Sequence, residues 1–405
     1  MKYLVILGDG MADEPIESLG NKTPLQFART PCMDLLAKKG NSGLLDTIPA
    51  GMHPGSEVAN LSVLGYDVEK VLEGRGSLEA ASMGVPILPG EIVMRCNLIC
   101  IEDGKIKNHS AGHISNEEAA ILIQYLNDHL GNDRLQFFPG VSYRHLLKLK
   151  AGNKHLHCTP PHDVLGTAFC KVLIQALNDE ARSTADYLND LIIRSQELLA
   201  NHPVNRERIA AGKDPANSIW PWSPGERPEM KKLFEIYPIR SGAVISAVDL
   251  IKGIGVYAGL ESIEVEGATG LYNTNYEGKA QAALAALKEK DFVFLHIEAS
   301  DEAGHEGDAA LKVKTIEYLD NRVLKPIWEE VKNWEEQVTI ALLPDHPTPC
   351  RIKTHTSDPV PFVIYNPLQT PDKVEVYDEF AAQKGSYGTL KGNEFMHKLF
   401  KVKNS

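Results

Sequence analysis

Residues 292–305 read FVFLHI-EASDEAGH, an apolar run that passes directly into two potential metal ligands, Asp301 and His305. The run 292–297 is typical of a buried strand, and such strands alternating with amphipathic helices predict a parallel sheet. On a helix, the spacing of Asp301 and His305 would place both side chains on one face, as two ligands of one metal require. The stretch therefore predicts an α/β fold, and it offers a pair of potential metal ligands that is a weak signal by itself, because such pairs also occur by chance.

Three further segments carry potential metal ligands, most of them also just past a strand-like run. The complete set is Asp9 after residues 3–8, Ser56 in the turn-rich residues 53–57, Asp301 and His305, Asp345 and His346 after residues 338–343, and His355. Each segment alone could be an ordinary turn, but four together favour a site. Carboxylates and imidazoles at strand ends suit a two-metal site for phosphoryl chemistry, and Ser56 supplies a potential nucleophile.

Length and composition limit the possible classes of protein. A chain of 405 residues exceeds the usual size of one core, so we expect two domains. Hydrophobic residues make up 43% and charged residues 24%, as in ordinary globular proteins. The formal net charge of -12 argues against nucleic acid or an anionic membrane as partner. A small anionic substrate stays possible, because a local pocket can be positive.

The chain also reads as cytoplasmic. Its six cysteines are scattered without a CxxC pair, which favours reduced thiols over a disulfide framework. The apolar run at residues 3–8 is too short for a signal peptide and meets Asp9 at once. No apolar stretch approaches the roughly 20 residues of a membrane span.

Strand-like and helix-like runs alternate at both ends of the chain. Helices are expected at 31–40 and 309–328, and one more strand at 361–365. We therefore predict an α/β fold, with a mostly parallel sheet covered by helices on both faces. Ligands of such sheets collect at the carboxyl ends of the strands.

The middle of the chain predicts a smaller inserted α+β domain. Strand candidates lie at 93–101, 135–138 and 144–149, and helical patterns at 117–130 and 184–201. The proline-rich stretch 220–225 indicates a boundary loop. Because the candidate ligands flank this block, we expect a core of residues 1–81 and 223–405, with residues 82–222 inserted.

Several motifs resemble one family over essentially the whole chain. The matching stretches are LGDGM at 7–11, KTPL at 22–25, GRGSLEA at 74–80, ISAVDLIKG at 245–253, GATG at 267–270 and EASDEAGH at 298–305. With them the chain resembles the archaeal type of cofactor-independent (2,3-bisphosphoglycerate-independent) phosphoglycerate mutases, in the alkaline phosphatase superfamily. The resemblance implies an alkaline-phosphatase-like core with two divalent metal ions and no 2,3-bisphosphoglycerate. Manganese is typical of the family, while magnesium and zinc remain possible.

The resemblance also implies a role for each candidate ligand. One metal would be held by Asp301, His305 and His355, and the other by Asp9, Ser56, Asp345 and His346. Ser56 would be the nucleophile and form a phosphoserine while 3-phosphoglycerate and 2-phosphoglycerate interconvert, a step of glycolysis. The inserted domain would be the lid that binds the substrate. The substrate-binding candidates, by resemblance, are His113, Arg144, His162, Asp163 and Lys252.

Two departures from the archaeal pattern leave the substrate open. Residues 108–113 read NHSAGH where archaeal members carry a more arginine-rich segment, and Asn60 stands where histidine is commoner. A bacterial branch resembling this chain has been proposed to phosphorylate homoserine, so phosphotransfer to a small alcohol is one alternative. Hydrolysis of phosphomonoesters is another, and a degenerate metal-binding scaffold is a third. The sequence has no GxxxxGK[ST] loop, which disfavours a P-loop kinase. The oligomeric state stays open.

Overall fold

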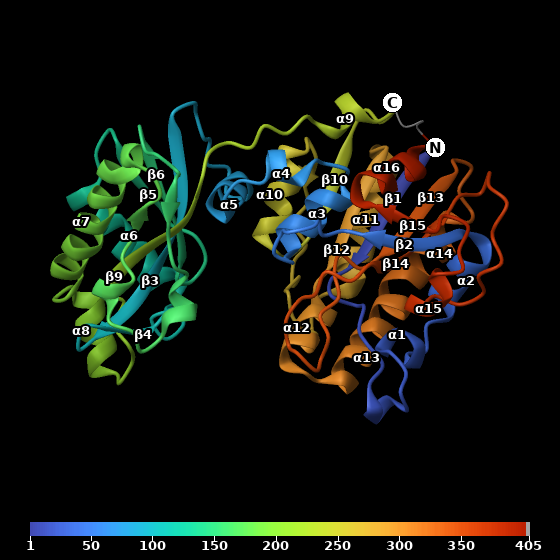
Figure 1. The fold of residues 1–405 in the computed structure, drawn as a ribbon, viewed down its shortest axis with the longest axis horizontal. Helices are drawn as coiled ribbons and strands as arrows, with labels where there is room; N and C mark the ends of the chain where they lie inside the picture. Colours follow the sequence, from blue (N-terminus) through green and yellow to red (C-terminus); the bar gives the residue numbers. More distant parts are fainter. Residues whose placement is uncertain (402–405) are drawn as a thin grey trace. The chain divides into compact units, whose positions relative to one another are not determined.

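A computed structural model describes residues 1–401 and divides the chain into two compact units. Met1–Leu72 and the chain from Glu229 onward form the core unit, and Glu73–Pro228 form the inserted unit. Figure 1 shows the chain coloured along the sequence, with the helices and strands labelled. None of the helices among the described residues is long and apolar enough to cross a membrane.

The core unit is built on an eight-stranded sheet. The strands, in their order across the sheet, are β11 (Glu261–Ser262), β10 (Gly242–Ile245), β12 (Phe292–Ile297), β1 (Lys2–Gly8), β13 (Val338–Leu343), β14 (Val360–Tyr365), β2 (Asn41–Asp46) and β15 (Thr389–Lys391). Only β14 runs antiparallel to its neighbours β13 and β2, and the other pairs are parallel. The predicted strands at residues 3–8, 292–297, 338–343 and 361–365 are confirmed.

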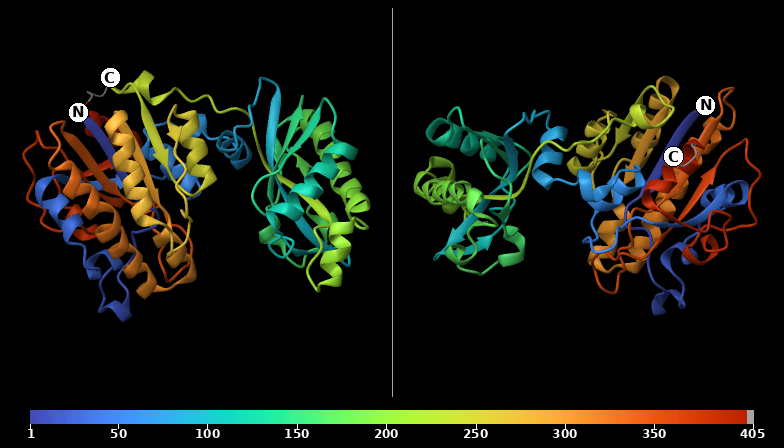
Figure 2. Two further views of the ribbon diagram at one scale, coloured as in Figure 1. Left: turned by 180° about the vertical axis from the view of Figure 1, so that it is seen from behind. Right: turned by 45° about the horizontal axis from the view of Figure 1, so that its top comes forward.

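Helices cover both faces of this sheet, as predicted (Figures 1 and 2). The helices of the core unit are α1 (Pro24–Phe27), α2 (Pro31–Lys39), α3 (Ser56–Val63), α4 (Val68–Val71), α9 (Leu233–Ile236), α10 (Asp249–Tyr257), α11 (Tyr276–Glu289), α12 (Ala299–Glu306), α13 (Ala309–Tyr318), α14 (Lys325–Val331), α15 (Glu379–Ala382) and α16 (Gly392–Phe400). On one face α2, α11 and α14 pack against the central strands. On the other, Tyr3 of β1 meets Phe400 of α16 with ring centroids 4.5 Å apart.

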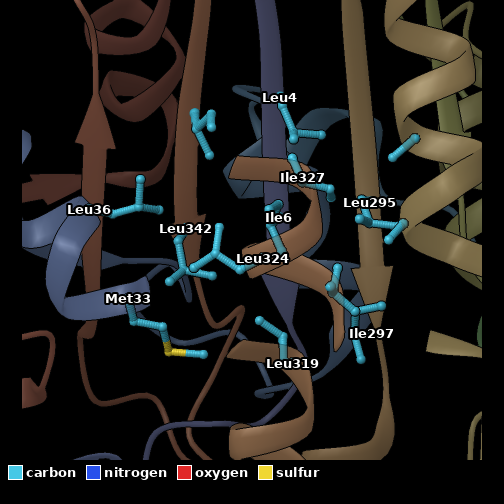
Figure 3. Close-up of a cluster of buried hydrophobic side chains, with 14 of the residues drawn as sticks. Leu4, Ile6, Met33, Leu36, Leu295, Ile297, Leu319, Leu324, Ile327 and Leu342 are labelled. Atoms are coloured by element: carbon cyan, nitrogen blue, oxygen red, sulfur yellow. The ribbon is translucent and has the colours of Figure 1, made fainter. Parts of the chain in front are cut away.

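Alternation along the strands divides the apolar side chains between the two faces. Figure 3 shows one of the resulting clusters, in which β1, β12 and β13 meet the helical segments. The labelled side chains are Leu4, Ile6, Met33, Leu36, Leu295, Ile297, Leu319, Leu324, Ile327 and Leu342, all buried. Burying such side chains on both faces stabilises the strands that end at the candidate ligands, at roughly 1.5–3 kcal/mol for each large aliphatic group.

The helix predicted at residues 309–328 is instead interrupted. Between α13 and α14 the residues Leu319–Leu324 form a π-helical turn. Pro326 follows in the first turn of α14, where its missing N–H would break an ordinary helical ladder. Asp320 in this turn is buried, and its carboxylate accepts hydrogen bonds from the N–H groups of Met33 (2.7 Å) and Cys32 (3.3 Å) at the start of α2.

The inserted unit has its own sheet and its own core. Its strands are β3 (Glu91–Glu102), β4 (Lys105–Asn108), β5 (Leu135–Phe138), β6 (Arg144–Lys150), β7 (Leu156–His157), β8 (Gln175–Ala176) and β9 (Ser218–Gly225). The order in the main sheet is β4-β3-β6-β5, and β9 pairs with β3. Its helices are α5 (Arg75–Ser82), α6 (Asn116–Leu130), α7 (Arg182–Leu199) and α8 (Pro203–Ala210). The expected strands and helices of this region are therefore present.

The predicted boundaries of the insertion need correction. The proline-rich stretch 220–225 is not a loop but part of β9, which pairs with β3 alone among the described strands. Prolines are tolerated in such an edge strand because one side needs no N–H donors. Residues 73–81, which we expected in the core, include most of α5, which packs on β3 and β9. The units therefore divide at 72/73 and 228/229 and not at 81/82 and 222/223.

Candidate active site and metal centre

Three neighbouring strands bring most of the candidate ligands to one edge of the sheet. β1 lies between β12 and β13, and the register pairs Leu7 with both His296 and Leu343. Asp9 follows β1 and continues its hydrogen bonding to β12, because the Asp9 N–H donates to Ile297 O at 2.9 Å. The segments after β12 and β13 end at the same edge because all three strands are parallel. Register therefore gathers ligands that are almost 340 residues apart in sequence.

One group of ligands consists of Asp301, His305 and His355. His305 Nε2 lies 3.2 Å from Asp301 Oδ2 and 3.0 Å from His355 Nε2. His355 Nε2 lies 3.4 Å from Asp301 Oδ1. Asp301 and His355 also come within 4.8 Å of His346, which the resemblance assigned to the other metal. The three predicted ligands of this metal are thus brought together, with His346 beside them.

The second group consists of Asp9, Asp345 and His346, whose ligand atoms lie within 4.8 Å of one another. His346 Nε2 is 3.6 Å from Asp9 Oδ1 and 3.5 Å from Asp345 Oδ2. Ser56, the first residue of α3, places its Oγ 3.2 Å from the same nitrogen. The structure therefore brings all seven predicted ligands into one region, and His346 joins the two groups.

The donor set fits divalent cations. The Nδ1 atoms of His305 and His355 face the carbonyl oxygens of Lys353 (3.0 Å) and Pro54 (3.4 Å). Because a carbonyl only accepts, each Nδ1 carries its proton, so Nε2 is the ring atom that faces the site. The two Nε2 atoms lie 3.0 Å apart, a distance at which a proton or a metal ion must offset the repulsion between their lone pairs. Asp9 Oδ1 is buried, with no hydrogen-bond partner among the described residues.

The electrostatics of the site point the same way. Burial, and then the nearby carboxylates of Asp345 and Asp301, raise the pKa of Asp9 well above its usual range. Burial also favours the neutral form of Asp301, but hydrogen bonds from His305 and His355 bring its pKa well below the usual range. Asp301 in turn raises the pKa of His305 to about 9. Three carboxylates lie close together here, and those of Asp9 and Asp345 are buried, an environment that bound cations stabilise.

A glycine is required beside the ligands. Gly10 has φ +60, and a Cβ at this position would lie 2.6 Å from Thr348 Oγ1 and 2.7 Å from Asp301 Oδ1. The Thr348 hydroxyl donates a hydrogen bond to Asp301 Oδ1 and lies 3.3 Å from His346 Nδ1. Thr348 therefore orients one ligand of each group, and Gly10 leaves the space for it. A side chain at residue 10 would push the two apart.

Asn60 links the candidate nucleophile to a candidate ligand. Its Nδ2 donates to Ser56 O and to Asp345 Oδ2, both at 2.9 Å. Asp345 Oδ1 accepts from the N–H groups of Gly10 (3.2 Å) and His346 (2.9 Å). The departure at residue 60 is thus compatible with an ordered site, because asparagine supplies the donor that holds Asp345 and the first turn of α3 together.

Lys252, the substrate-binding candidate of the core unit, is engaged by a carboxylate. It lies on α10 and is mostly buried, and its Nζ is 2.7 and 2.8 Å from the two oxygens of Glu264. A buried ammonium needs such a partner. If another anion displaced the Glu264 carboxylate, Lys252 Nζ would be available to bind that anion.

The other four candidates lie in the inserted unit, near a group of aromatic rings. The His113 and Arg144 side chains lie 6.2 and 5.8 Å from the Tyr143 ring. His162 lies 5.7 Å from the Trp222 ring, and its Nε2 is 3.6 Å from Asp163 Oδ1. The four predicted residues thus gather in one region of this unit.

Two residues outside the predicted set also belong to this region. His109 lies between Tyr143 (5.7 Å) and His162 (6.0 Å), and Arg95 lies over the Trp222 ring at 4.6 Å. Burial lowers the pKa of Arg95, Glu79 opposes this effect, and Arg75 and Arg144 add repulsion. We call His109, His113, Arg144, His162 and Arg95 the arginine–histidine cluster. Burial lowers the pKa of His109 and His162, so the positive charge of the cluster comes from its two arginines, and guanidinium groups held close together favour an anionic ligand.

Comparison with known proteins decides the family. A family model described as 2,3-bisphosphoglycerate-independent phosphoglycerate mutase matches residues 37–205. The protein of that name from Methanosarcina barkeri is 52% identical to this chain over 100% of both chains. The chain belongs to the 2,3-bisphosphoglycerate-independent phosphoglycerate mutase family. A probable member of this mutase family from Geobacter sulfurreducens is 46% identical over 98% of this chain and 99% of its own.

Solved structures agree with the mutase family. A protein of Pyrococcus horikoshii is 31% identical, covers 100% of this chain and 98% of its own, and has a TM-score of 0.84. The cofactor-independent phosphoglycerate mutase of Thermoplasma acidophilum is 26% identical over 99% of this chain and 100% of its own, with a TM-score of 0.70. The predicted family and the predicted α/β fold class are confirmed.

Proposed function

We propose that this protein interconverts 3-phosphoglycerate and 2-phosphoglycerate through a phosphoserine at Ser56. One observation carries the proposal. Ser56 Oγ lies 3.2 Å from Nε2 of His346, the residue that belongs to both groups of candidate ligands. A hydroxyl in this position is suited to attack a phosphoryl group that the same site binds. The names of relatives that match the full length of the chain support the choice of substrate.

Two divalent cations are the proposed cofactors. Asp301, His305 and His355 would hold one, and Asp9, Ser56, Asp345 and His346 the other, with His346 near both. When bound, such ions lower the pKa of a nearby hydroxyl and offset the charge of a phosphoryl group in transfer. Mixed carboxylate and imidazole ligands suit manganese, our first choice, and also zinc; magnesium is the third candidate.

The residues of the chain itself orient the reacting groups. Ser56 opens α3, so its hydroxyl lies at the N-terminal end of a helix, where the backbone N–H groups favour an anion. Asn60 holds this turn against Asp345 through its two hydrogen bonds. After transfer, the alcohol stays bound and takes the phosphoryl group back on its other hydroxyl. Mutase activity then depends on excluding water from the phosphoserine.

The arginine–histidine cluster of the inserted unit is a proposed binding region for an anionic group. His113, Arg144 and His162 would contact that group, and Asp163 would orient His162. In the core unit, Lys252 would bind phosphate in place of Glu264. The substrate is a small phosphomonoester anion. We propose a cytoplasmic location, in keeping with the free thiols of all six cysteines.

One experiment tests the proposal against its alternatives. The purified protein with Mn²⁺ would receive 3-phosphoglycerate and, separately, homoserine with a nucleoside triphosphate, and phosphorus NMR would follow the products. We expect 2-phosphoglycerate from the first mixture and no O-phosphohomoserine from the second. O-phosphohomoserine without 2-phosphoglycerate would replace the mutase by a phosphotransferase. Inorganic phosphate as the sole product would replace it by a hydrolase.

A further inference from the structure

A second group of buried polar side chains lies behind Asp9, outside the predicted ligand set. It consists of His296 in β12, Glu298 directly after that strand, Ser246 after β10 and Lys279 in α11. Each is at most 4% exposed. Burying charged groups is costly unless they are paired, so their placement together requires a compensating arrangement.

The group forms one continuous line of contacts that ends at Asp9. His296 Nε2 lies 3.2 Å from Asp9 Oδ2, and His296 Nδ1 lies 3.2 Å from Glu298 Oε1. Lys279 Nζ donates to the other oxygen of Glu298, Oε2, and to the backbone oxygen of His296 at 3.2 Å. Acidic and basic side chains therefore alternate along the line from Asp9 to Lys279.

Glu298 is anchored independently of the histidine. Its Oε1 accepts hydrogen bonds from the Ser246 hydroxyl at 2.9 Å and from the Ala247 N–H at 2.8 Å. With Lys279 on Oε2, the carboxylate is held from β10 and α11 at the same time. A carboxylate fixed in this way fixes the imidazole ring that lies against it.

The two oxygens of Asp9 have different surroundings. Oδ2 faces His296, whereas Oδ1 lies on the side of His346, at 3.6 Å, and has no hydrogen-bond partner among residues 1–401. Oδ2 thus lies against the His296 ring, in a charge contact and without a hydrogen bond, while Oδ1 is left for a ligand. This division is what an oriented metal-binding carboxylate requires.

We propose that His296 is a positioning residue: its ring, fixed from behind by Glu298 and Lys279, orients Asp9 so that Oδ1 binds a cation. The inference rests on the proposed metal site and deepens it. The alternative is a purely structural role, in which the line only ties β12 to β10 and α11. The two roles differ in their effect on the two metal positions, because the side chains of the line reach Asp9 and not the side chains of Asp301, His305 or His355. Glu298 meets Asp301 only through its backbone oxygen, which accepts the Asp301 N–H at 3.0 Å and which side-chain changes leave in place.

The test measures Mn²⁺ binding by electron paramagnetic resonance and calorimetry, with His296→Phe as the principal variant. His296→Phe removes both ring nitrogens and keeps the ring, whereas His296→Gln keeps an amide nitrogen close to the position of Nε2. We expect His296→Phe to weaken Mn²⁺ binding at the Asp9 position by about 10–100-fold. The metal position that contains Asp301 should keep its affinity for Mn²⁺. In His296→Gln, most of the affinity lost at the Asp9 position should be restored. Lys148→Met is the matched control, since it removes a buried cation of the inserted unit, which pairs with Glu91.

A second variant covers the case in which His296→Phe does not fold. The double change Lys279→Met and Glu298→Leu replaces the supporting pair by apolar side chains and leaves no unpaired charge. It should also weaken the Asp9 position selectively. Wild-type binding in folded His296→Phe, or equal weakening of both positions, would overturn the positioning role. Two bound Mn²⁺ ions in a wild-type protein without mutase activity would instead overturn the proposed function and leave the positioning role standing.

Discussion

Ser56 Oγ lies 3.2 Å from His346 Nε2, although the two residues are 290 positions apart in the chain. The contact joins the first turn of α3 to the segment after β13. It gives the site a hydroxyl within the group of carboxylates and imidazoles. Because the hydroxyl belongs to Ser56 and most metal ligands belong to other residues, a mutation of Ser56 should remove phosphoryl transfer and leave metal binding in place.

Ser56→Ala should abolish mutase activity, because no other group at this position can carry the phosphoryl group. We expect kcat to fall to background in a coupled assay of 2-phosphoglycerate formation. Asp9, Asp345 and His346 remain, so Mn²⁺ should still bind at both positions. Full activity in Ser56→Ala would rule out the phosphoserine mechanism. Ser62→Ala, a buried serine of the same helix, serves as the comparison.

His346→Ala should affect both metal positions, whereas His305→Ala should affect one. The reason is geometric, since His346 comes within 4.8 Å of the ligand atoms of both groups. His305 contacts only Asp301 and His355 among the candidate ligands. Mn²⁺ titrations of the two variants, followed by metal content after gel filtration, check this difference. Identical stoichiometries in the two variants would contradict a shared ligand.

Removal of metal should destabilise the core unit selectively. Asp9 is then buried beside the carboxylates of Asp345 and Asp301 without a cation, and burial, followed by repulsion from these two carboxylates, raises its pKa. A cation that binds only the folded state stabilises it by about 2.7 kcal/mol at 100 times its Kd. Hydrogen exchange with and without chelator, read separately for the two units, measures the effect. Protection should fall around β1, β12 and β13, and exchange within the core of the inserted unit, for example in α7, should stay unchanged.

Lys312→Met should destabilise the core unit strongly. Lys312 Nζ lies 2.8 Å from Asp13 Oδ2, both side chains are fully buried, and the same nitrogen donates to Thr348 O at 2.8 Å. Loss of one partner of a buried pair costs about 3–5 kcal/mol, since the other charge is left alone. Denaturant unfolding measures the change. Adding Asp13→Asn to Lys312→Met should recover part of the lost stability. The control is Arg240→Met: the Arg240 side chain is 89% exposed, so its removal should cost under about 1 kcal/mol.

The stability of the inserted unit should fall in acid because of His145. Burial lowers the pKa of His145 to about 3, from an ordinary value of about 6.5. Between these values the unfolded chain binds a proton that the folded unit does not. The contribution of neutral His145 to the free energy of unfolding is therefore complete above pH ~6.5. It is lost as the pH falls toward 3, with a slope of up to about 1.4 kcal/mol per pH unit.

His145→Asn provides the test of this pH dependence. Asparagine can still accept the hydrogen bond that Gly140 N–H donates to His145 Nδ1 at 3.1 Å, but it does not titrate. The free energies of unfolding of the wild type and the variant, measured from pH 7 to pH 4, should converge as the pH falls. Parallel curves over this range would show that His145 does not titrate on unfolding.

Much of the fold was predictable because its signals are local. The strand at 292–297 is a continuous apolar run, and α6 begins one residue before the predicted helix at 117–130. Two features were not predictable in the same way: the π-helical turn that follows Tyr318, and the proline-containing strand β9. A π-helical turn depends on Asp320 reaching α2, and prolines in a strand depend on its place at a sheet edge.

The residue types of the metal centre were evident in the sequence, but the residues that support it were not. Thr348 stands between two prolines and gives no sign that its hydroxyl meets Asp301. His296 is the one polar residue in its apolar run, a signal that sequence reading passed over. Lys279 lies among alanines in α11, where nothing local indicates a buried ammonium.

The sequence by itself determined the alternation of strands and helices, the seven ligand types and the family, because each depends on residues close together in the chain. Only the tertiary structure decided that Ser56 meets His346, that His346 serves both groups, and that one oxygen of Asp9 lies against His296 while the other is left open. The reason is register. The pairing of β1 with β12 and β13 sets which side chains share the edge of the sheet.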